Sequence, residues 1–374
     1  MIDMQNPPVL VFPNLLGSAE ALSVLLARFN LYGSKVYELS NGQIQKIVIL
    51  AGVKENVLTS EKISQYKYLQ IIRVSDPSKN VFKFAAMSRT ILKTFGIRPR
   101  LLVSSDVYIG FLTTFFTLLL LRIHVPIQVS LHGKVLRDED SSINRFIRQN
   151  YLALVLRLAG SIRIVSKALE LEILSQFKIQ LHKVFIAPIP VELPNIGNYQ
   201  KSKVIAFVGR LHEERGVEEW VEIVCQLSRL RQDFSVYLIG DGPLQKKVKL
   251  SFETDSPKLP LKVFGYLTKS ELNKIWPEIK ILLSSAKDEG YGLSLREAIL
   301  SSAYVVARSN SGSEVLRDEL PHLVFTYNDV TEAVLKLNLL LELEYPDFES
   351  EKFRVRMKER NLDSLHAIAK SWIS

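Results

Sequence analysis

Cysteine is almost absent from this chain of 374 residues, which contains Cys225 alone. A single thiol cannot form a disulfide framework within the chain or a cysteine-rich metal site. This cysteine usage fits a reducing compartment. The start of the sequence also lacks a positively charged flank followed by an apolar run and a cleavage site, so we expect no signal peptide. We therefore expect a cytoplasmic protein.

Long hydrophobic runs are also missing. The most apolar run, from Tyr108 to Leu121, has 14 residues, whereas a helix that spans a bilayer needs about 20. We interpret this run as a buried helix, with shallow membrane contact as the lesser alternative. Tandem repeats and low-complexity segments are absent. The composition, 47% hydrophobic and 23% charged, is that of a globular protein.

The positive charge is confined to the first half of the chain. Residues 1–195 contain 23 Lys+Arg and 13 Asp+Glu, a net charge of +10, whereas residues 196–374 contain 25 and 26, a net charge of −1. A basic surface attracts anionic lipid or nucleic acid. Solubility charge spread over several helices explains the excess equally well. Neither a zinc pattern nor a basic stretch with interleaved aromatics is present, so we expect no nucleic-acid partner.

Strands and helices alternate through the first half. Such alternation is typical of a doubly wound parallel sheet. The predicted strands are Val9–Phe12, Lys35–Leu39, Ile47–Leu50, Leu69–Arg73, Leu101–Ser105, Ile127–Leu131, Ile162–Val165 and Val184–Ala187. The predicted helices are Ser18–Leu31, Val81–Phe95, Tyr108–Leu121, Asn144–Leu158 and Ala168–Phe177.

A proline-rich segment separates this half from the next. Pro188, Pro190 and Pro194 cannot continue a helix or a strand, so we place the domain boundary there. The length of the chain also suggests two domains. The alternation then restarts, with strands at Val204–Val208, Ser235–Ile239, Leu261–Phe264, Ile279–Leu283 and Tyr304–Ala307. The later helices are Val217–Leu230, Leu244–Phe252, Ser270–Trp276 (begun by its Ser), Thr331–Leu343 and Phe353–Trp372.

The segment DEGYGLSLREAIL, residues 288–300, carries the strongest chemical signal. It follows a predicted strand and has a glycine-bearing turn before a helix. A helix N-terminus offers unpaired N–H groups to a phosphate, and glycine lets the ligand approach the backbone. Glu289 can face the hydroxyls of a ligand, and Glu297 lies about two turns into the helix. An ordinary turn with two solvated acids is the alternative.

Two arginines follow the strand Val204–Val208. Arg210 and Arg215 lie in one strand-to-helix loop and could both reach a single diphosphate, because guanidinium stays charged and pairs with phosphate oxygens. In isolation the better explanation is that both pair with Glu213 and Glu214 on a solvated loop.

Taken together, these motifs resemble the nucleotide-sugar half of retaining GT-B glycosyltransferases of family 4. The resemblance is strong over residues 200–320, supportive over 125–193 and weak over 1–100. Its segments are VGRLHEERGVEE, LIGDGPL, VFGYL and EGYGLSLREA, supported by SLHG, RIVSKALE and IPVEL. It implies an α/β fold with two doubly wound Rossmann-like domains facing a cleft. Residues 1–193 would bind the acceptor, residues 194–349 would bind the donor, and a helix over residues 350–374 would return to the first domain.

The resemblance also implies roles for individual residues. Arg210 and Arg215 match the basic pair that holds the donor diphosphate, although most relatives have Lys at the position of Arg215. Glu289 matches the acid that faces the donor sugar, and Glu297 matches the acid that binds the ribose. The other donor-binding positions are Gly209, Gly265, Tyr266, Gly290, Tyr291, Gly292, Leu293 and Ser294.

Two further positions belong to the first domain. His132 matches a histidine near the reacting sugar, and a core histidine at a strand end is the alternative. Gly17 and Ser18 stand where relatives carry a Gly-Gly pair, so their contact with phosphate or acceptor is the weakest of these assignments.

The implied reaction moves a sugar from a nucleotide-sugar to a glycan or lipid-linked acceptor, as in cell-surface polysaccharide or glycolipid synthesis. The resemblance implies retention at the anomeric carbon. Arginines and a helix N-terminus can stabilise the departing diphosphate, and the sequence has no suitable Asp-x-Asp triplet, so we expect neither a metal nor a cofactor. A peripheral position on the inner face of an anionic membrane would suit the basic half. The alternative is a non-catalytic nucleotide- or glycan-binding protein with the same fold.

Overall fold

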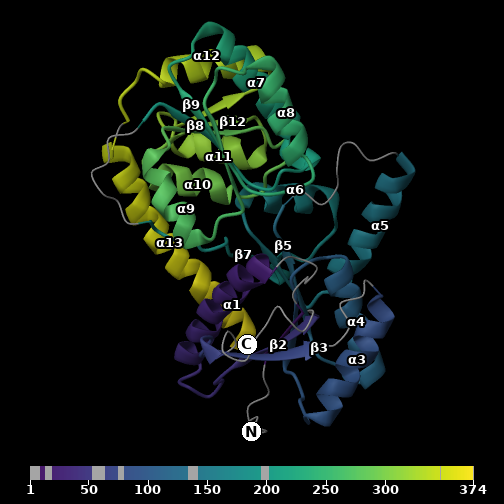
Figure 1. Ribbon diagram of the computed structural model, residues 1–374. Coiled ribbons are helices and arrows are strands. Elements are labelled where there is room, and N and C mark those ends of the chain that lie inside the picture. The colour runs from purple at the N-terminus through teal and green to yellow at the C-terminus, as the bar shows by residue number, and fades with distance from the viewer. Residues whose placement is uncertain are drawn as a thin grey trace. The chain divides into compact units, whose positions relative to one another are not determined.

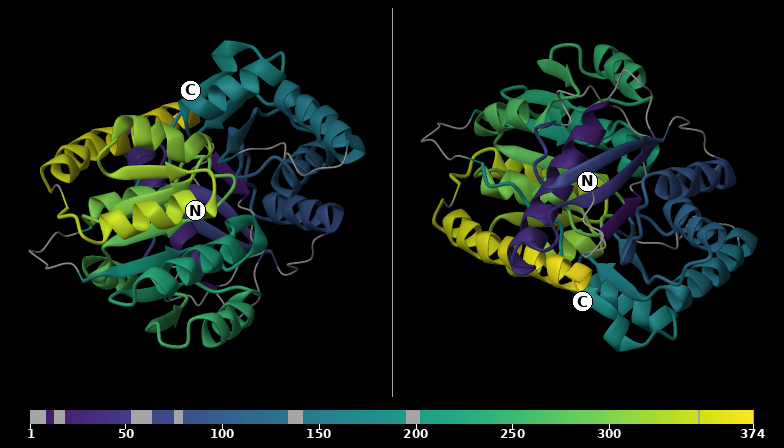
Figure 2. Two further views of the ribbon diagram at one scale, coloured as in Figure 1. Left: turned by 90° about the horizontal axis from the view of Figure 1, so that it is seen from above. Right: turned by 90° about the horizontal axis from the view of Figure 1, so that it is seen from below.

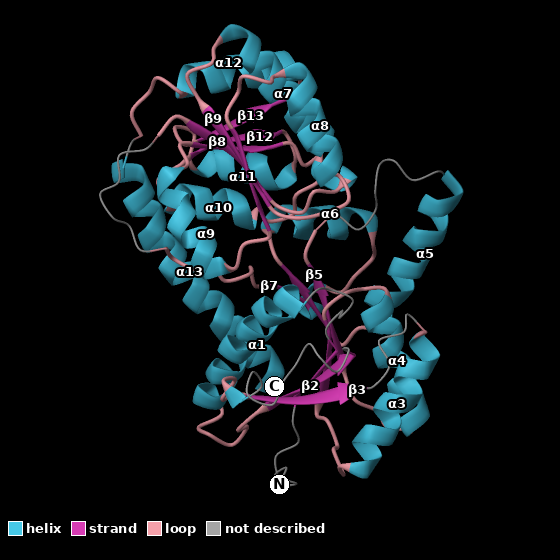
Figure 3. Cartoon of the chain, in the orientation of Figure 1, coloured by secondary structure: helices cyan, strands magenta, loops and turns pink. Residues whose placement is uncertain are grey.

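The computed structural model describes residues 9–12, 19–52, 64–74, 80–133, 142–194, 202–345 and 347–373. Contacts divide the chain into two compact units. Unit 1 comprises Met1–Pro188 and Leu362–Ser374, and unit 2 comprises Ile189–Asn361. Each unit combines helices with a parallel sheet (Figure 3).

Unit 1 has a seven-stranded sheet in the order β3-β2-β1-β4-β5-β6-β7. Its strands are β1 (Val9–Phe12), β2 (Ile47–Gly52), β3 (Leu69–Val74), β4 (Leu101–Ser104), β5 (Ile127–Leu131), β6 (Ser161–Ile164) and β7 (Val184–Ile186). Its helices are α1 (Ala19–Leu39), α3 (Val81–Thr94), α4 (Ile109–Leu121), α5 (Ser142–Leu158), α6 (Lys167–Gln176) and the 3₁₀ turn η2 (Leu181–Lys183).

The two faces of this sheet carry separate cores. Successive strand residues point to opposite faces, and β2 shows this directly. Ile47 and Ile49 pack in the core that includes α1, whereas Val48 and Leu50 pack in the core that includes α3. Helices therefore cover both faces, as the labels α1, α3 and α4 show in Figure 1, and Figure 2 gives two further views of the same ribbon.

The last helix, α13 (Asp347–Ile373), ends in unit 1. Its Trp372 is 2% exposed and lies against the rings of Phe29 and Tyr32 of α1, with centroids 6.4 and 5.8 Å away. The indole Nε1–H donates to Oε1 of Gln128 on β5 at 2.7 Å. The C-terminal helix thus supplies core side chains to the N-terminal unit, as the sequence predicts.

Unit 2 has a six-stranded sheet in the order β10-β9-β8-β11-β12-β13. Its strands are β8 (Val204–Val208), β9 (Ser235–Ile239), β10 (Leu261–Gly265), β11 (Ile281–Ser284), β12 (Tyr304–Arg308) and β13 (Val324–Tyr327). Its helices are α7 (Val217–Leu230), α8 (Gln245–Asp255), α9 (Lys269–Ile275), α10 (Leu293–Leu300), α11 (Ser311–Glu319) and α12 (Val330–Leu340), with 3₁₀ turns η3 (Glu213–Arg215) and η4 (Trp276–Glu278).

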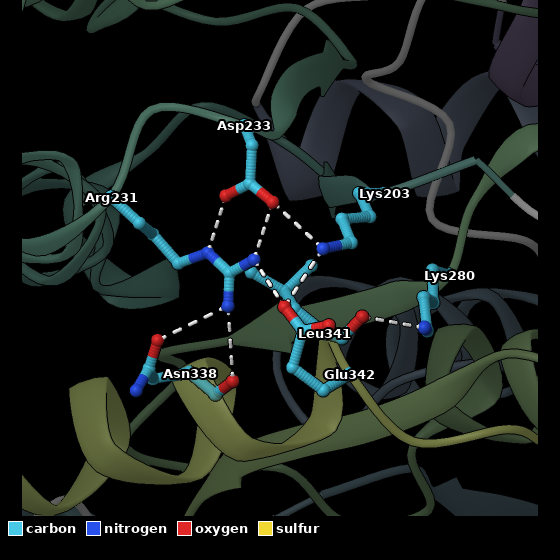
Figure 4. Close-up of polar contacts among 7 residues, drawn as sticks. All are labelled: Lys203, Arg231, Asp233, Lys280, Asn338, Leu341 and Glu342. Atoms are coloured by element: carbon cyan, nitrogen blue, oxygen red, sulfur yellow. Dashed lines mark hydrogen bonds and ion pairs between the residues drawn. The ribbon is translucent and has the colours of Figure 1, made fainter.

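An ion-pair network holds the amino-terminal edge of this sheet (Figure 4). Arg231 makes two hydrogen bonds of 2.6 Å to Asp233, which also pairs with Lys203 at 2.7 Å, and both cations reach Glu342 after α12. Hydrogen bonds from Arg231 and Lys203 hold the pKa of Asp233 well below its usual range. The network ties the loops before β8 and β9 to the end of α12.

The structure corrects several sequence-based predictions. Lys35–Leu39 is not a strand but the last turns of α1, in which Leu26, Phe29 and Val36 are buried at helical spacing. Its Val and Tyr residues favour a strand locally, but burial of the helical face decides. The helix α9 is capped by Thr268, in a capping box with Glu271, rather than by Ser270. The sequence analysis also missed α11 and β13.

The apolar run Tyr108–Leu121 forms the N-cap and the body of α4 (Ile109–Leu121), and most of it is covered. Phe111, Thr114 and Thr117 are buried, whereas Leu119 and Leu120 at its end are exposed. Within the described parts of the chain, the length and hydropathy needed to cross a membrane are not found together in any helix.

Candidate functional site

The predicted functional residues of unit 2 lie at the point in its sheet where the strand order reverses. Strands β8 and β11 are paired neighbours, and β9 and β12 lie on their outer sides. In open α/β sheets, ligands bind beyond the carboxyl ends of strands at such a switch point. Here those ends lead into the loop Gly209–Gly216 after β8 and the loop Ser285–Gly292 after β11. These loops carry the predicted arginines and Glu289.

An ion pair joins the two loops. Arg215 Nη1 lies 2.8 Å from Glu289 Oε2, and the side chains are 34% and 18% exposed. Both groups are therefore partly sheltered but still open to a ligand. Residues 74 positions apart in the sequence meet here, and the sequence-based alternative for Arg215, pairing with Glu213 or Glu214, is not the pairing that forms.

Close backbone packing holds these loops in register. Gly216 has φ +63°, and a Cβ built on it would lie 2.0 Å from the carbonyl oxygen of Ser285. The Ser285 hydroxyl donates to the Gly216 carbonyl at 2.7 Å and to the Arg215 carbonyl at 3.2 Å. Only glycine suits this contact, because it accepts both the left-handed conformation and the close approach.

We expect Gly216→Ala to destabilise unit 2 by more than about 1 kcal/mol, because the new methyl adds a clash to the cost of a positive φ. The measurement is the thermal unfolding midpoint. Gly265→Ala is the matched control, since Gly265 has φ +69° and open space around a built Cβ. Equal losses in the two variants would mean that the contact with Ser285 contributes nothing.

Arg210 takes a different partner. Its guanidinium pairs with Glu214, one helical turn along the loop, and its side chain is 68% exposed. The sequence-based alternative is thus correct for Arg210 in this structure. The two arginines are not paired with a common acid, and Arg215 alone lies against Glu289.

The glycine turn before α10 forms the predicted helix N-terminus. Gly292 is the N-cap, with φ +68° and no side chain to cap the first turn. Glu289 Oε1 accepts the Gly292 N–H at 3.3 Å. Leu293 and Ser294 are the first two residues of α10, so their N–H groups have no carbonyl acceptor within the helix. The turn therefore places a carboxylate beside amides that can bind an anion.

The inner side of this turn is built from two side chains of the same motif. Tyr291 is 6% exposed, and the Arg296 guanidinium lies 3.9 Å from its ring centroid. Burial lowers the pKa of Arg296 from its usual value and raises the pKa of Tyr291. Gly312 of α11 packs so closely that a Cβ on it would lie 2.3 Å from the Glu289 carbonyl oxygen. Tyr291 thus supports the turn from within, on the side away from solvent.

Glu297 has a partner that the sequence analysis missed. Lys269, the first residue of α9, lies 2.5 Å from Glu297 Oε1, and their side chains are 26% and 16% exposed. Gly265 ends β10, and Tyr266, which is 42% exposed, follows it three residues before this lysine. The sequence did contain a signal for this ion pair, since Lys269 stands only three residues after the segment predicted to lie beside the nucleotide base.

The remaining predicted positions lie elsewhere. Gly209 follows β8 and donates to the Ile239 carbonyl at 3.0 Å. His132 follows β5 in unit 1, where it is exposed rather than part of the core. Desolvation by surrounding protein and the charges of Arg163 and Arg28 lower its pKa. Because the His132 side chain is open to solvent, we attribute its lowered pKa mainly to the positive charges of the two guanidiniums. Gly17 and Ser18 lie outside the described residues.

A comparison with known protein families matches the part of the chain that contains these loops. Residues 190–362 match the family described as "Glycosyl transferases group 1". This segment coincides closely with unit 2 and contains both loops of the switch point.

Residues 190–362 form a glycosyl transferases group 1 domain.

Curated proteins that are similar to this chain are glycosyltransferases. Poly(ribitol-phosphate) alpha-N-acetylglucosaminyltransferase of Staphylococcus aureus (strain COL) is 21% identical over 216 residues, 56% of this chain and 42% of the relative. The 2-deoxystreptamine glucosyltransferase of Streptomyces kanamyceticus is 26% identical over 140 residues, 37% of this chain and 36% of the relative. The chain therefore spans less than half the length of these relatives.

The fold likeness extends over nearly the whole chain. The crystal structure of HepE from Anabaena in complex with UDP and glucose has a TM-score of 0.66 and 13% identity, covering 98% of this chain and 95% of that one. The α/β fold of this chain is thus of the GT-B class, as the sequence predicts.

Proposed function

We propose that this chain is a retaining, metal-independent glycosyltransferase of family 4, which moves a sugar from a nucleotide-sugar to a glycan or lipid-linked acceptor. The observation that carries the proposal is the Arg215–Glu289 pair beside the N-terminus of α10. The group 1 domain supports the reaction class. The relative from Staphylococcus aureus is a poly(ribitol-phosphate) N-acetylglucosaminyltransferase, which favours cell-surface polysaccharide or glycolipid synthesis.

The chemistry of the pair fits departure of a nucleoside diphosphate. In the transfer, the bond between the anomeric carbon and a phosphate oxygen breaks, and its electron pair stays on the diphosphate. Arg215 and the amides of Leu293 and Ser294 are donors for that developing charge. The acceptor hydroxyl oxygen forms the new bond to the anomeric carbon, and its proton passes to an oxygen of the departing diphosphate. These protein groups supply the positive field, so we propose that no metal is needed.

Glu289 and Glu297 would contact the donor at two places. Glu289 would accept hydrogen bonds from hydroxyls of the sugar, because its carboxylate lies between the guanidinium and the turn. Glu297 would exchange Lys269 for the ribose, or would bind the ribose with Lys269 still in place. Arg210 is exposed and free to leave Glu214 for the diphosphate. His132 would serve near the reacting sugar.

We expect UDP and a UDP-sugar to raise the thermal unfolding midpoint of the protein more than GDP or ADP do. UDP is the first candidate because the similar Anabaena structure contains it. At a hundredfold excess over Kd, one bound ligand stabilises by about 2.7 kcal/mol, which is several degrees for a domain of this size. Arg215→Ala should abolish most of the shift, and Arg229→Ala, an exposed residue of α7, should retain it.

The second candidate, a non-catalytic binding protein, rests on the same residues of the two loops. It predicts the thermal shift but no release of nucleoside diphosphate when donor and acceptor are both present. An assay of UDP release from UDP-sugars with a panel of acceptors separates the two. A shift with no release under any acceptor favours binding alone, and absence of any shift contradicts both.

A further inference from the structure

The helix α5 presents an apolar stripe that no described part of unit 1 covers. The stripe comprises Ile143, Phe146, Ile147, Leu154 and Leu158, which are 46–74% exposed. At about 100° per residue these positions share one side of the helix. The buried residues of α5, Leu152, Val155 and Leu156, lie on the opposite side. The stripe therefore faces away from the core of its own unit.

The first half of α5 extends beyond the body of unit 1. Of residues 142–150, all but Arg148 are exposed, and none is buried. Figure 1 shows this end of α5 projecting past α3 and α4. The second half is anchored, because Tyr151 stacks on Tyr108 at 5.8 Å and its hydroxyl donates to the Val107 carbonyl at 2.9 Å. The anchored half holds the projecting half in a fixed direction.

The charge on and around this helix is positive. α5 contains Arg145, Arg148 and Arg157 and no acid. Across the described residues from Asn80 to Leu169, eleven Lys or Arg stand against one acid, Asp106. Residues 134–141 precede α5 outside the described part, and with them included the segment 134–158 still has five Lys or Arg against three acids.

We propose that α5 is a membrane-binding helix, whose exposed apolar stripe enters the surface of a bilayer that contains anionic lipid. An amphipathic helix with bulky apolar residues on one side and basic residues around it binds in this way. At about 100° per residue, Arg157 lies beside the stripe, whereas Arg145 and Arg148 lie toward the opposite side of α5. Arginine stems can lie along the apolar surface while the guanidiniums reach headgroup phosphates. The stripe from Ile143 to Leu158 is about 22 Å long, so it lies along the membrane and does not cross it.

A second copy of the chain is the other occupant that an apolar stripe could suit. Two copies of α5 brought face to face would place like charges together, which opposes association. An anionic surface instead gains from each arginine. The charge thus favours lipid over self-association. It also moves the expected membrane contact from the run Tyr108–Leu121 to the helix that follows it.

The test is flotation of the full chain with vesicles at low salt. We expect binding to phosphatidylcholine vesicles that contain phosphatidylglycerol, loss of binding at high salt, and little binding to phosphatidylcholine alone. The variant Arg145→Ala/Arg148→Ala should weaken binding about 25-fold, at about fivefold for each basic residue near the surface. The variant Ile143→Ser/Phe146→Ser/Ile147→Ser should weaken it by more than about tenfold.

The matched control is Lys246→Ala/Lys249→Ala/Leu250→Ser on α8, which removes two exposed lysines and one exposed leucine from unit 2. It should bind vesicles as the wild type does. All the substituted positions are exposed or, for Arg148, half-buried, so unfolding midpoints should stay close to that of the wild type. Wild-type binding by both α5 variants would overturn the proposal. So would a dimer that depends on Phe146 in sedimentation, without vesicle binding. Neither readout needs a nucleotide-sugar, so failure here leaves the transfer reaction untouched.

Discussion

Replacing Glu289 by Gln is expected to lower turnover by about 100-fold or more while leaving affinity for the nucleoside diphosphate unchanged or higher. Loss of one preorganised electrostatic group at a reacting centre has effects of this size. Gln keeps the size of the side chain and can still accept the Gly292 N–H. It removes the charge that now neutralises Arg215 at 2.8 Å, so that guanidinium becomes more available to the diphosphate. Steady-state kinetics with calorimetry on UDP separates the two effects.

Glu218→Gln is the control for this variant. Glu218 also forms an ion pair in unit 2, with Lys247, but both side chains are more than half exposed and lie outside the two loops. We expect wild-type kinetics from it. Turnover by Glu289→Gln equal to that of the wild type would remove the acid from the mechanism. A parallel fall in turnover, UDP affinity and unfolding midpoint would instead mean that the ion pair mainly holds the loops together.

The alternation of elements could be predicted because most strands here are buried on both faces. Such strands are short runs of apolar residues, as in Val204–Val208, with helices and turns between them. The same logic failed at Lys35–Leu39, where a short apolar run belongs to the end of a long helix. It also failed at α11, whose start contains Asn310 and Ser313 and so has the composition of a loop. In the structure these two residues form a capping box.

The site could be predicted in part, for a related reason. The order of strands brings the ends of β8 and β11 together, so loops found from sequence motifs had to be neighbours once the topology was assumed. The partner of each charge does not follow from topology. Arg210 forms an ion pair with the nearby Glu214, and Glu297 forms one with Lys269 of α9. The stacking of Arg296 on Tyr291 was equally hidden, because arginine at that helical position predicts an exposed side chain.

Replacing Trp372 by Ala should destabilise unit 1 by about 3–5 kcal/mol. The indole is 2% exposed and lies against Phe29 and Tyr32, so truncation leaves a cavity between α1 and the end of α13. It also removes the 2.7 Å hydrogen bond that Gln128 Oε1 accepts from the indole Nε1–H. The loss of this partner for a buried oxygen adds a desolvation cost. Deleting Leu362–Ser374 should have a larger effect in the same direction.

Fluorescence and circular dichroism together locate the loss. The other two tryptophans, Trp220 and Trp276, lie in unit 2, so fluorescence of Trp372→Ala reports unit 2 alone, while circular dichroism reports both units. We expect circular dichroism to show an unfolding transition of unit 1 at a lower temperature than in the wild type. We expect the fluorescence transition, which reports unit 2, to have a midpoint that UDP still raises. Leu362→Ala, on the same helix but 61% exposed, should leave both transitions in place. A Trp372→Ala protein that melts as the wild type does would show that this segment is a tail, since an indole with these contacts cannot be removed from a core at no cost.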